Sequence, residues 1–110
     1  MKKLVYICSP YRGDIIPNIK AARLHCKFAV ENNAVPIAPH LLFPQFMSDM
    51  NTEERELAIK MDIFILERCD ELWVFGDVIS EGMQQEINQA EKLGKEIKYF
   101  DGATAEGGIT

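Results

Sequence analysis

The chain has 110 residues, of which 47% are hydrophobic and 26% are charged, and this composition is typical of one globular domain with a modest core. Its formal net charge of −5 argues against a nucleic-acid polymer as the main partner, although a few local cations are enough to hold a small phosphorylated ligand. Because no apolar run approaches ~18 residues, we expect no membrane role, and the start of the chain does not read as a signal peptide.

The three cysteines, Cys8, Cys26 and Cys69, all lie in apolar or helical segments. There is no Cys-x-x-Cys pair and no dense group of histidines. This pattern predicts reduced, buried thiols in a cytoplasmic protein, and it predicts no structural metal.

Strand-like and helical patterns alternate along the chain, with four predicted strands and three predicted helices. The expected strands are 3–8, 34–38, 71–75 and 95–100, and the expected helices are 17–31, 52–68 and 83–93. Such alternation predicts an α/β fold: a small doubly wound, flavodoxin-like or Rossmann-like parallel sheet of four to five strands with helices on both faces. Residues 1–100 form the expected domain, and residues 101–110 form a flexible or partner-docked tail.

A turn-rich loop follows the first strand, at the position where doubly wound proteins often hold phosphates or sugars. Ser9 and Pro10 open it, Arg12 offers a forked cation, and Gly13 allows a close approach of the backbone. The loop has neither a GxGxxG nor a P-loop pattern, so a surface loop that happens to carry an arginine is an equally good reading.

The second strand ends in a proline-rich apolar segment, 39–44, which we expect to be a stiff loop that walls a pocket or forms a subunit contact. Pro36 places the strand itself at an edge of the sheet. His40 follows at the carboxyl end of this strand. It either faces a ligand crevice or simply packs the loop.

The helix predicted over 52–68 is apolar nearly all round in its second half, so we expect one side to meet the sheet and the other a second subunit. Asp62 lies within this apolar stretch. A buried carboxylate needs a partner or takes up a proton, so Asp62 is either a functional residue or one half of an ion pair.

The stretch 69–94 reads as strand, short loop and helix, with Ser80 and Gly82 at the helix start. Glu86 lies in the first turns of this helix, beside an apolar stripe. It therefore points toward the carboxyl ends of the strands, where open α/β sheets bind ligands. The alternative is a solvated acid favoured by the helix dipole.

Four segments, spanning about residues 4–100, resemble the nucleoside 2-deoxyribosyltransferase superfamily, which includes the 2'-deoxynucleoside 5'-monophosphate N-glycosidases. They are the opening YICSPY, the MDIFILERCD segment, SEGMQQEINQAEKLGK, and the final strand KEIKYF. The resemblance implies that Glu86 is the nucleophile and that Asp62 lies in the site. It also implies that Ser80 helps to hold a 5'-phosphate, as in the monophosphate hydrolases. Asn88 departs from the family's glycine.

The resemblance thus predicts cleavage or transfer at the N-glycosidic bond of a nucleoside or nucleoside 5'-monophosphate, with no cofactor. Glu86 would attack the anomeric carbon, Asp62 would hold or protonate the leaving base, and Tyr6 would orient Glu86. Ser9, Pro10, Arg12, Gly13, His40, Ser80 and Gly82 would contact the substrate. We expect a homodimer or homotetramer. The alternatives are a non-catalytic nucleotide-binding module of the same fold and an oligomeric interaction protein.

Overall fold

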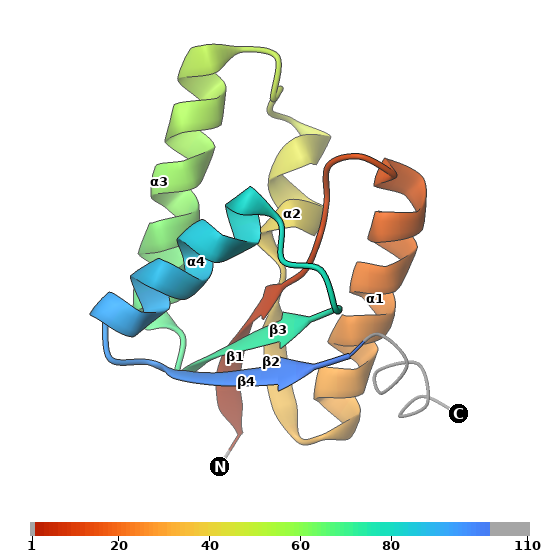
Figure 1. Ribbon diagram of the computed structural model, residues 1–110, viewed down its shortest axis with the longest axis vertical. Helices are drawn as coiled ribbons and strands as arrows, with labels where there is room; N and C mark the ends of the chain where they lie inside the picture. Colours follow the sequence, from red (N-terminus) through yellow and green to blue (C-terminus); the bar gives the residue numbers. More distant parts are fainter. Residues whose placement is uncertain (1, 102–110) are drawn as a thin grey trace.

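A computed structural model describes residues 2–101 of the chain as one parallel sheet flanked by helices (Figure 1). The elements in chain order are β1 (Lys3–Cys8), α1 (Ile15–Glu31), β2 (Ala34–Ile37), α2 (Pro39–Leu42), the 3-10 helix η1 (Phe43–Gln45), α3 (Thr52–Arg68), β3 (Glu71–Phe75), α4 (Glu81–Lys92) and β4 (Glu96–Phe100). The expected boundary between a domain and a tail at residue 101 falls where the described residues end, and residues 102–110 lie outside them.

The four strands are ordered β2-β1-β3-β4, and each neighbouring pair is parallel. The predicted α/β fold with a parallel sheet is therefore confirmed. Strand β2 lies at an edge, as its proline predicted, and Pro36 is in register with Val5 of β1. All four strands end at the same edge of the sheet, so the segments that follow them meet there.

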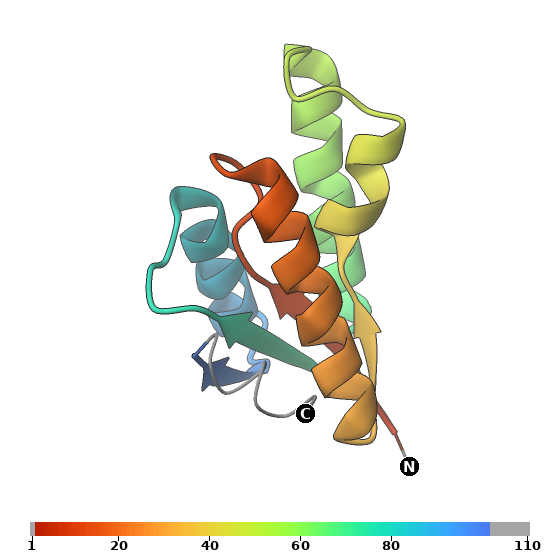
Figure 2. The same ribbon diagram turned by 90° about the vertical axis from the view of Figure 1, so that its right-hand side faces the viewer.

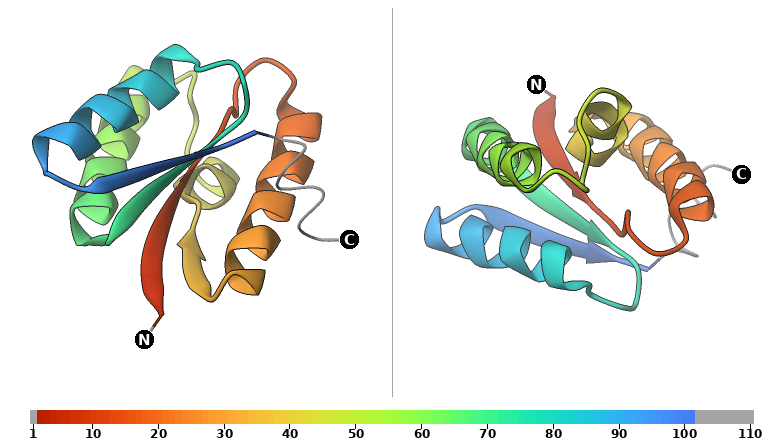
Figure 3. Two further views of the ribbon diagram at one scale, coloured as in Figure 1. Left: turned by 60° about the horizontal axis from the view of Figure 1, so that its bottom comes forward. Right: turned by 90° about the horizontal axis from the view of Figure 1, so that it is seen from above.

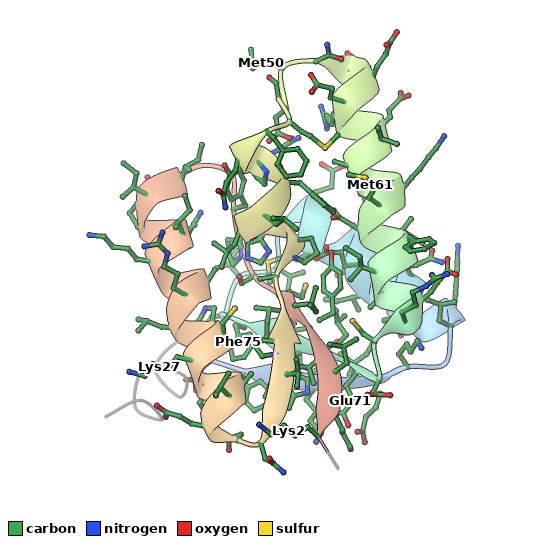
Figure 4. All side chains as sticks on the ribbon, turned by 180° about the vertical axis from the view of Figure 1, so that it is seen from behind. Lys2, Lys27, Met50, Met61, Glu71 and Phe75 are labelled. Carbon is green, nitrogen blue, oxygen red and sulfur yellow. The ribbon has the colours of Figure 1, made fainter. Side chains whose placement is uncertain are left out.

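Alternate residues of β1 and β3 enter two separate cores, because successive side chains in a strand point to opposite faces. Tyr6, Cys8, Leu72 and Val74 pack beneath α3 and α4. Val5, Ile7, Trp73 and Phe75 pack beneath α1, where the His25 ring stacks on Phe75 at 4.2 Å. Figure 2 shows α1 in front of the sheet, and Figure 4 labels Phe75.

A second set of contacts fixes the register at the start of the sheet. Asp70 accepts the backbone N–H of Leu4 with its side chain, and its own N–H is donated to the Leu4 carbonyl. Next to it, the buried carboxylate of Glu71 is paired with Lys3 and Lys98 and accepts the Trp73 indole N–H. These bonds satisfy a buried charge that would otherwise be costly.

The segment 39–44, expected to be a loop, is helical: it forms α2 and then η1. Each of these short helices begins with a proline at its first or second position, where the missing N–H and the fixed φ cost nothing. The first helix also begins earlier than predicted, at Ile15, because Pro17 fits within the first turn.

Helix α3 is capped by Asn51, whose side chain accepts the Glu54 N–H. Only part of the helix is covered: Leu66 is buried, whereas Leu57, Ile59 and Phe64 are 51%, 40% and 56% exposed. Figure 4 shows Met61 on α3 and Met50 on the connector ahead of it. Within residues 2–101, no helix is both long and apolar enough to cross a membrane.

We expect Leu72→Ala to lower the free energy of unfolding by about 2–5 kcal/mol, because Leu72 is fully buried in the central strand β3. Urea denaturation followed by circular dichroism would measure this loss. Val78→Ala is the matched control, since Val78 is 77% exposed and its truncation should change stability by less than about 0.5 kcal/mol. Equal effects for the two variants would contradict this account of the core.

Candidate functional site

Glu86 is positioned by the way α4 begins. The Ser80 hydroxyl accepts the Met83 N–H and so caps the helix directly after the loop that follows β3. Met83, Ile87 and Ala90 form the buried stripe, as their spacing predicted. Glu86 lies beside this stripe and is half-buried. Its carboxylate therefore faces the strands.

The Tyr6 hydroxyl donates a hydrogen bond to Glu86 Oε2. Tyr6 is almost completely buried in the middle of β1, and Cys8, two residues later on the same face, donates its thiol to the Met83 carbonyl at 3.8 Å. Burial and the nearby Glu86 charge keep the pKa of Tyr6 well above its usual value, so the phenol remains a donor. The bond therefore fixes the direction of the Glu86 carboxylate.

The two acids, Glu86 and Asp62, both titrate near neutral pH. Burial raises the pKa of Glu86 to about 7, against the opposing effects of the hydrogen bond from Tyr6 and of the nearby Cys8 thiol. Burial, together with the negative charge of Glu86, raises the pKa of Asp62 to about 7. The charge of Asp62 also raises the pKa of Tyr6. The three groups, from β1, α3 and α4, therefore interact electrostatically.

Among the residues that the structure describes, Asp62 does not form the ion pair that was its alternative interpretation. Its Oδ1 atom is buried and has no hydrogen-bond partner among the described residues. Buried polar atoms in proteins are almost always satisfied, so an unpaired carboxyl oxygen marks a place where a ligand or a water molecule can donate. The described residues therefore offer here two carboxyl groups, from α3 and α4, that interact electrostatically and titrate near pH 7.

Ser9 and His40 form a second pair, with Ser9 Oγ and His40 Nε2 separated by 3.0 Å. Burial and the neighbouring His25 lower the pKa of His40 to about 4, so its ring is neutral at pH 7. Burial also lowers the pKa of His25 to about 4, consistent with a core histidine stacked on Phe75. Ser9 is therefore engaged with the segment that follows β2.

His40 lines a cavity of about 380 Å³ between α1 and the α2–η1 segment. Its wall also contains Tyr11, Ile19, Arg23, Leu41, Pro44 and Gln45. Neither Glu86 nor Asp62 belongs to this wall. Glu86 on α4 and Asp62 on α3 thus interact with Tyr6, whereas His40 lines the cavity beside α1.

The remaining predicted site residues are exposed or only partly covered. The Arg12 Nε atom donates to Asp49 Oδ2 at 3.3 Å, and Gly13 has φ +90, a conformation that glycine adopts without strain. Pro10 is half-buried in the same loop. Gly82, in the first turn of α4, has nothing within 4 Å of the place a Cβ would occupy, so the surface there is open.

Sequence reasoning did not single out Tyr11, Arg23, Gln45, Cys8 or Asp49. Tyr11 and Cys8 could have been found, since both lie in or beside the loop that ends β1. Arg23, Gln45 and Asp49 carried no signal, because their neighbours come from other segments of the chain. Within residues 2–101, no group of three or more His, Cys, Asp or Glu side chains is arranged to hold a metal ion.

Residues 3–100 match the sequence model of one family almost end to end. The chain belongs to the family described as Domain of unknown function (DUF7768). That description assigns no activity to its members. No curated protein matches the chain.

Among solved structures, the DUF7768 chain is similar to a 2-deoxyribosyltransferase from the psychrotolerant bacterium Bacillus psychrosaccharolyticus. The TM-score is 0.69 and the sequence identity 18%, and the likeness covers 89% of this chain and 72% of that one. The resemblance carried by four short segments of the sequence is thus matched by a likeness of the fold.

The carboxyl pair predicts how stability depends on pH. Asp62 and Glu86 have usual pKa values of 3.8 and 4.5, and the folded chain raises both to about 7. The folded state therefore binds more protons than the unfolded state between these values, and the free energy of unfolding should fall as the pH rises from about 4 to 7. Asp62→Asn should remove on the order of 2 kcal/mol of this fall.

Urea denaturation at a series of pH values would measure the difference between the parent protein and Asp62→Asn. Asp14→Asn, an exposed acid in the loop before α1, is the control and should leave the slope unchanged. If the difference between the parent and Asp62→Asn were the same at pH 4 and pH 7.5, Asp62 would not be a shifted acid.

Proposed function

We propose that this protein cleaves or transfers at the N-glycosidic bond of a nucleoside or nucleoside 5'-monophosphate, with Glu86 as the nucleophile. The observation that carries the proposal is the Glu86 carboxylate, oriented by the Tyr6 hydroxyl and electrostatically coupled to Asp62. The fold likeness to a 2-deoxyribosyltransferase supports it, since that enzyme's name describes transfer of a deoxyribosyl group.

In this mechanism, Glu86 attacks the anomeric carbon from the face opposite the base. The carbon–nitrogen bond breaks, its electron pair goes to the base, and Asp62 in its acid form gives the base a proton. The positive charge that develops on the sugar is stabilised by the nearby carboxylate. Water, losing a proton to Asp62, then releases the sugar from Glu86, whereas a second base would complete a transfer.

The pKa values of Glu86 and Asp62, both about 7, suit the roles of nucleophile and acid. Glu86 accepts a hydrogen bond from the Tyr6 hydroxyl, and this bond favours the ionised form of Glu86. Two coupled acids in this pH range hold one proton between them at neutral pH, so Asp62 is the natural carrier of that proton. A nucleophile and an acid would then be present at once.

The loops at the carboxyl edge of the sheet supply groups for the rest of the substrate. Ser80 sits at the N-terminus of α4, where a hydroxyl and free backbone N–H groups favour a phosphate. Arg12 offers a cation in the adjacent loop. The cavity with Tyr11, His40 and Gln45 combines aromatic and hydrogen-bonding groups that could hold a part of the substrate away from the bond that breaks.

One observation favours a second candidate, a nucleotide-binding module without turnover. Neither Glu86 nor Asp62 lines the His40 cavity, so a ligand seated there would not by itself touch the carboxyl pair. Such a module would bind a nucleotide and leave it intact. Turnover assays separate the two functions directly.

We expect the purified protein to release free base from at least one of the common nucleosides or nucleoside 5'-monophosphates, as measured by chromatography. Glu86→Gln should reduce the rate roughly 10³-fold or more, because it removes the nucleophile while keeping the size of the side chain. Tyr6→Phe should reduce the rate roughly ten-fold, because Glu86 would lose its orienting donor.

Glu81→Gln is the matched control, since Glu81 lies in the first turn of the same helix and is exposed. It should retain nearly full activity. Activity that survived Glu86→Gln would remove Glu86 from the mechanism, and binding without release of base from any substrate would favour the module instead.

We also propose that the exposed apolar stripe of α3 joins copies of the chain. Leu57, Met61 and Phe64 recur at helical spacing on this helix, and Leu57 and Phe64 are about half exposed. An exposed stripe of this kind is typical of an association surface. The contact would give the homodimer or homotetramer expected from the sequence.

Phe64→Glu should therefore shift the protein toward monomer in analytical ultracentrifugation, because a charge would be buried at the contact. Val30→Glu is the control: Val30 is 54% exposed on α1, on the other face of the sheet. A parent protein that is monomeric at all concentrations, or equal dissociation by both variants, would contradict the assignment of this surface.

A further inference from the structure

Two side-chain hydrogen bonds join β1 to α4 in the described part of the chain. The Tyr6 hydroxyl donates to Glu86 Oε2, and the Cys8 thiol donates to the Met83 carbonyl at 3.8 Å. Tyr6 and Cys8 are two residues apart, so they lie on one face of β1. Met83 and Glu86 are three residues apart, so they are neighbours on the surface of α4. The two bonds therefore follow one another along the same pair of elements.

The direction of α4 makes these two bonds work together. The helix runs opposite to its neighbour β4, and all four strands are parallel, so the first turn of α4 lies near the carboxyl end of β1 (Figure 3). Two residues of strand span ~7 Å and three residues of helix rise ~4.5 Å, so the bonds have similar spacings on both elements. A slide or rotation of α4 that breaks one bond therefore disturbs the other.

Cys8 is fully buried, and the Met83 side chain beside it is also buried. The thiol therefore has no access to a substrate, and any effect on the reaction passes through another residue. Burial and the nearby Glu86 charge keep the pKa of Cys8 far above its usual value. The thiol thus stays protonated at neutral pH and remains an uncharged donor.

Few titratable groups act on Glu86 in this core. The Tyr6 hydroxyl and the Cys8 thiol lower the pKa of Glu86 against the effect of burial, and Asp62 of α3 is the acid that interacts with it. The phenol of Tyr99, on the same face of β4, is 62% exposed. The side chains that β3 and β4 contribute to the core are uncharged: Leu72, Val74 and Ile97.

We propose that Cys8 is a positioning residue, whose thiol holds the first turn of α4 against β1 and so keeps the Glu86 carboxylate aligned with the Tyr6 hydroxyl. The catalytic meaning of this inference rests on the proposed function, because a nucleophile must face the reacting carbon in one direction. Without the thiol, α4 would keep its Ser80 cap but lose one of its two side-chain links to β1. The hydrogen bond from Tyr6 to Glu86 would then weaken.

The test is a titration of the Glu86 carboxyl carbon by NMR in the full chain labelled with ¹³C-glutamate, with Glu86→Gln to identify the signal. All samples carry Asp62→Asn, so that Glu86 titrates without its coupled neighbour. Cys8→Ala should raise the Glu86 midpoint by roughly half a pH unit, because the ionised form loses stabilising contacts. Cys8→Ser should return most of this shift, since its hydroxyl is also a donor.

Cys69→Ala is the matched control. Cys69 is an equally buried thiol of the same core, but it lies at the end of α3, and the charged groups that act on it are Lys95 and Asp70. It should lower the free energy of unfolding about as much as Cys8→Ala does, and leave the Glu86 midpoint unchanged. If Cys8→Ala does not fold, Cys8→Val replaces it, because valine suits a strand and has no donor.

The rate of base release gives a second measurement, with Asp62 restored. Cys8→Ala should lower the rate roughly three-fold at pH 6 and much less at pH 8, because a raised midpoint reduces the ionised fraction of Glu86 mainly below that midpoint. A rate lowered equally at both values would contradict a role that acts through the Glu86 carboxylate.

An unchanged Glu86 midpoint in Cys8→Ala would overturn the inference, even in an active protein. An equal shift in Cys69→Ala would also overturn it, as would a Cys8→Ser variant that titrates like Cys8→Ala. A shift specific to Cys8 in a protein that releases no base from any substrate would support the positioning of Glu86 and contradict the proposed function. The two failures are therefore distinguishable.

Discussion

The hydrogen bond from Tyr6 to Glu86 connects two residues that are 80 positions apart, and the rest of the site depends on it. A half-buried carboxylate needs a donor, and β1 supplies one from the middle of the sheet. The bond forms because β1 lies beside β3, the strand that leads into α4. The pairing of β1 with β3 thus brings Tyr6, near the start of the chain, against α4, near its end.

The carboxyl pair, Glu86 and Asp62, adds a second constraint, because burial and mutual repulsion raise the pKa values of these acids to about 7 and oppose their simultaneous ionisation. Asp62 comes from α3, which contacts both β1 and α4. The unpaired Oδ1 of Asp62 and the buried carboxyl of Glu86 lower the stability of the fold relative to apolar side chains at the same positions. A loss of stability concentrated in one group of residues, here Asp62 and Glu86, is typical of a functional site.

Much of this arrangement follows from local patterns in the sequence. The apolar run of β3, the cap at Ser80 and the stripe from Met83 to Ala90 together determine where Glu86 points, and the apolar stretch around Asp62 predicts a buried acid. The placement of Tyr6 below Glu86 was implied by the family resemblance rather than by spacing.

Other features depend on contacts between distant segments and had no local signal. The helical form of residues 39–45 was missed because two prolines in an apolar run read as a loop, although each can begin a helix. The Ser9–His40 pair and the cavity beside it arise where two strand ends meet. Arg12 was identified as a candidate ligand-binding cation, but its partner Asp49 was not predicted, because Asp49 lies in a connector with no pattern of its own.

The two edges of the sheet have a consequence for how copies of this chain can meet. Pro36 removes one backbone donor from β2, and the other edge, β4, carries the exposed charges of Glu96 and Lys98. Both features discourage an incoming strand from pairing there. Growth of a continuous sheet from molecule to molecule is therefore disfavoured at each end, so ordered assembly falls to the helical layers, where contacts can close on themselves instead of extending into fibres.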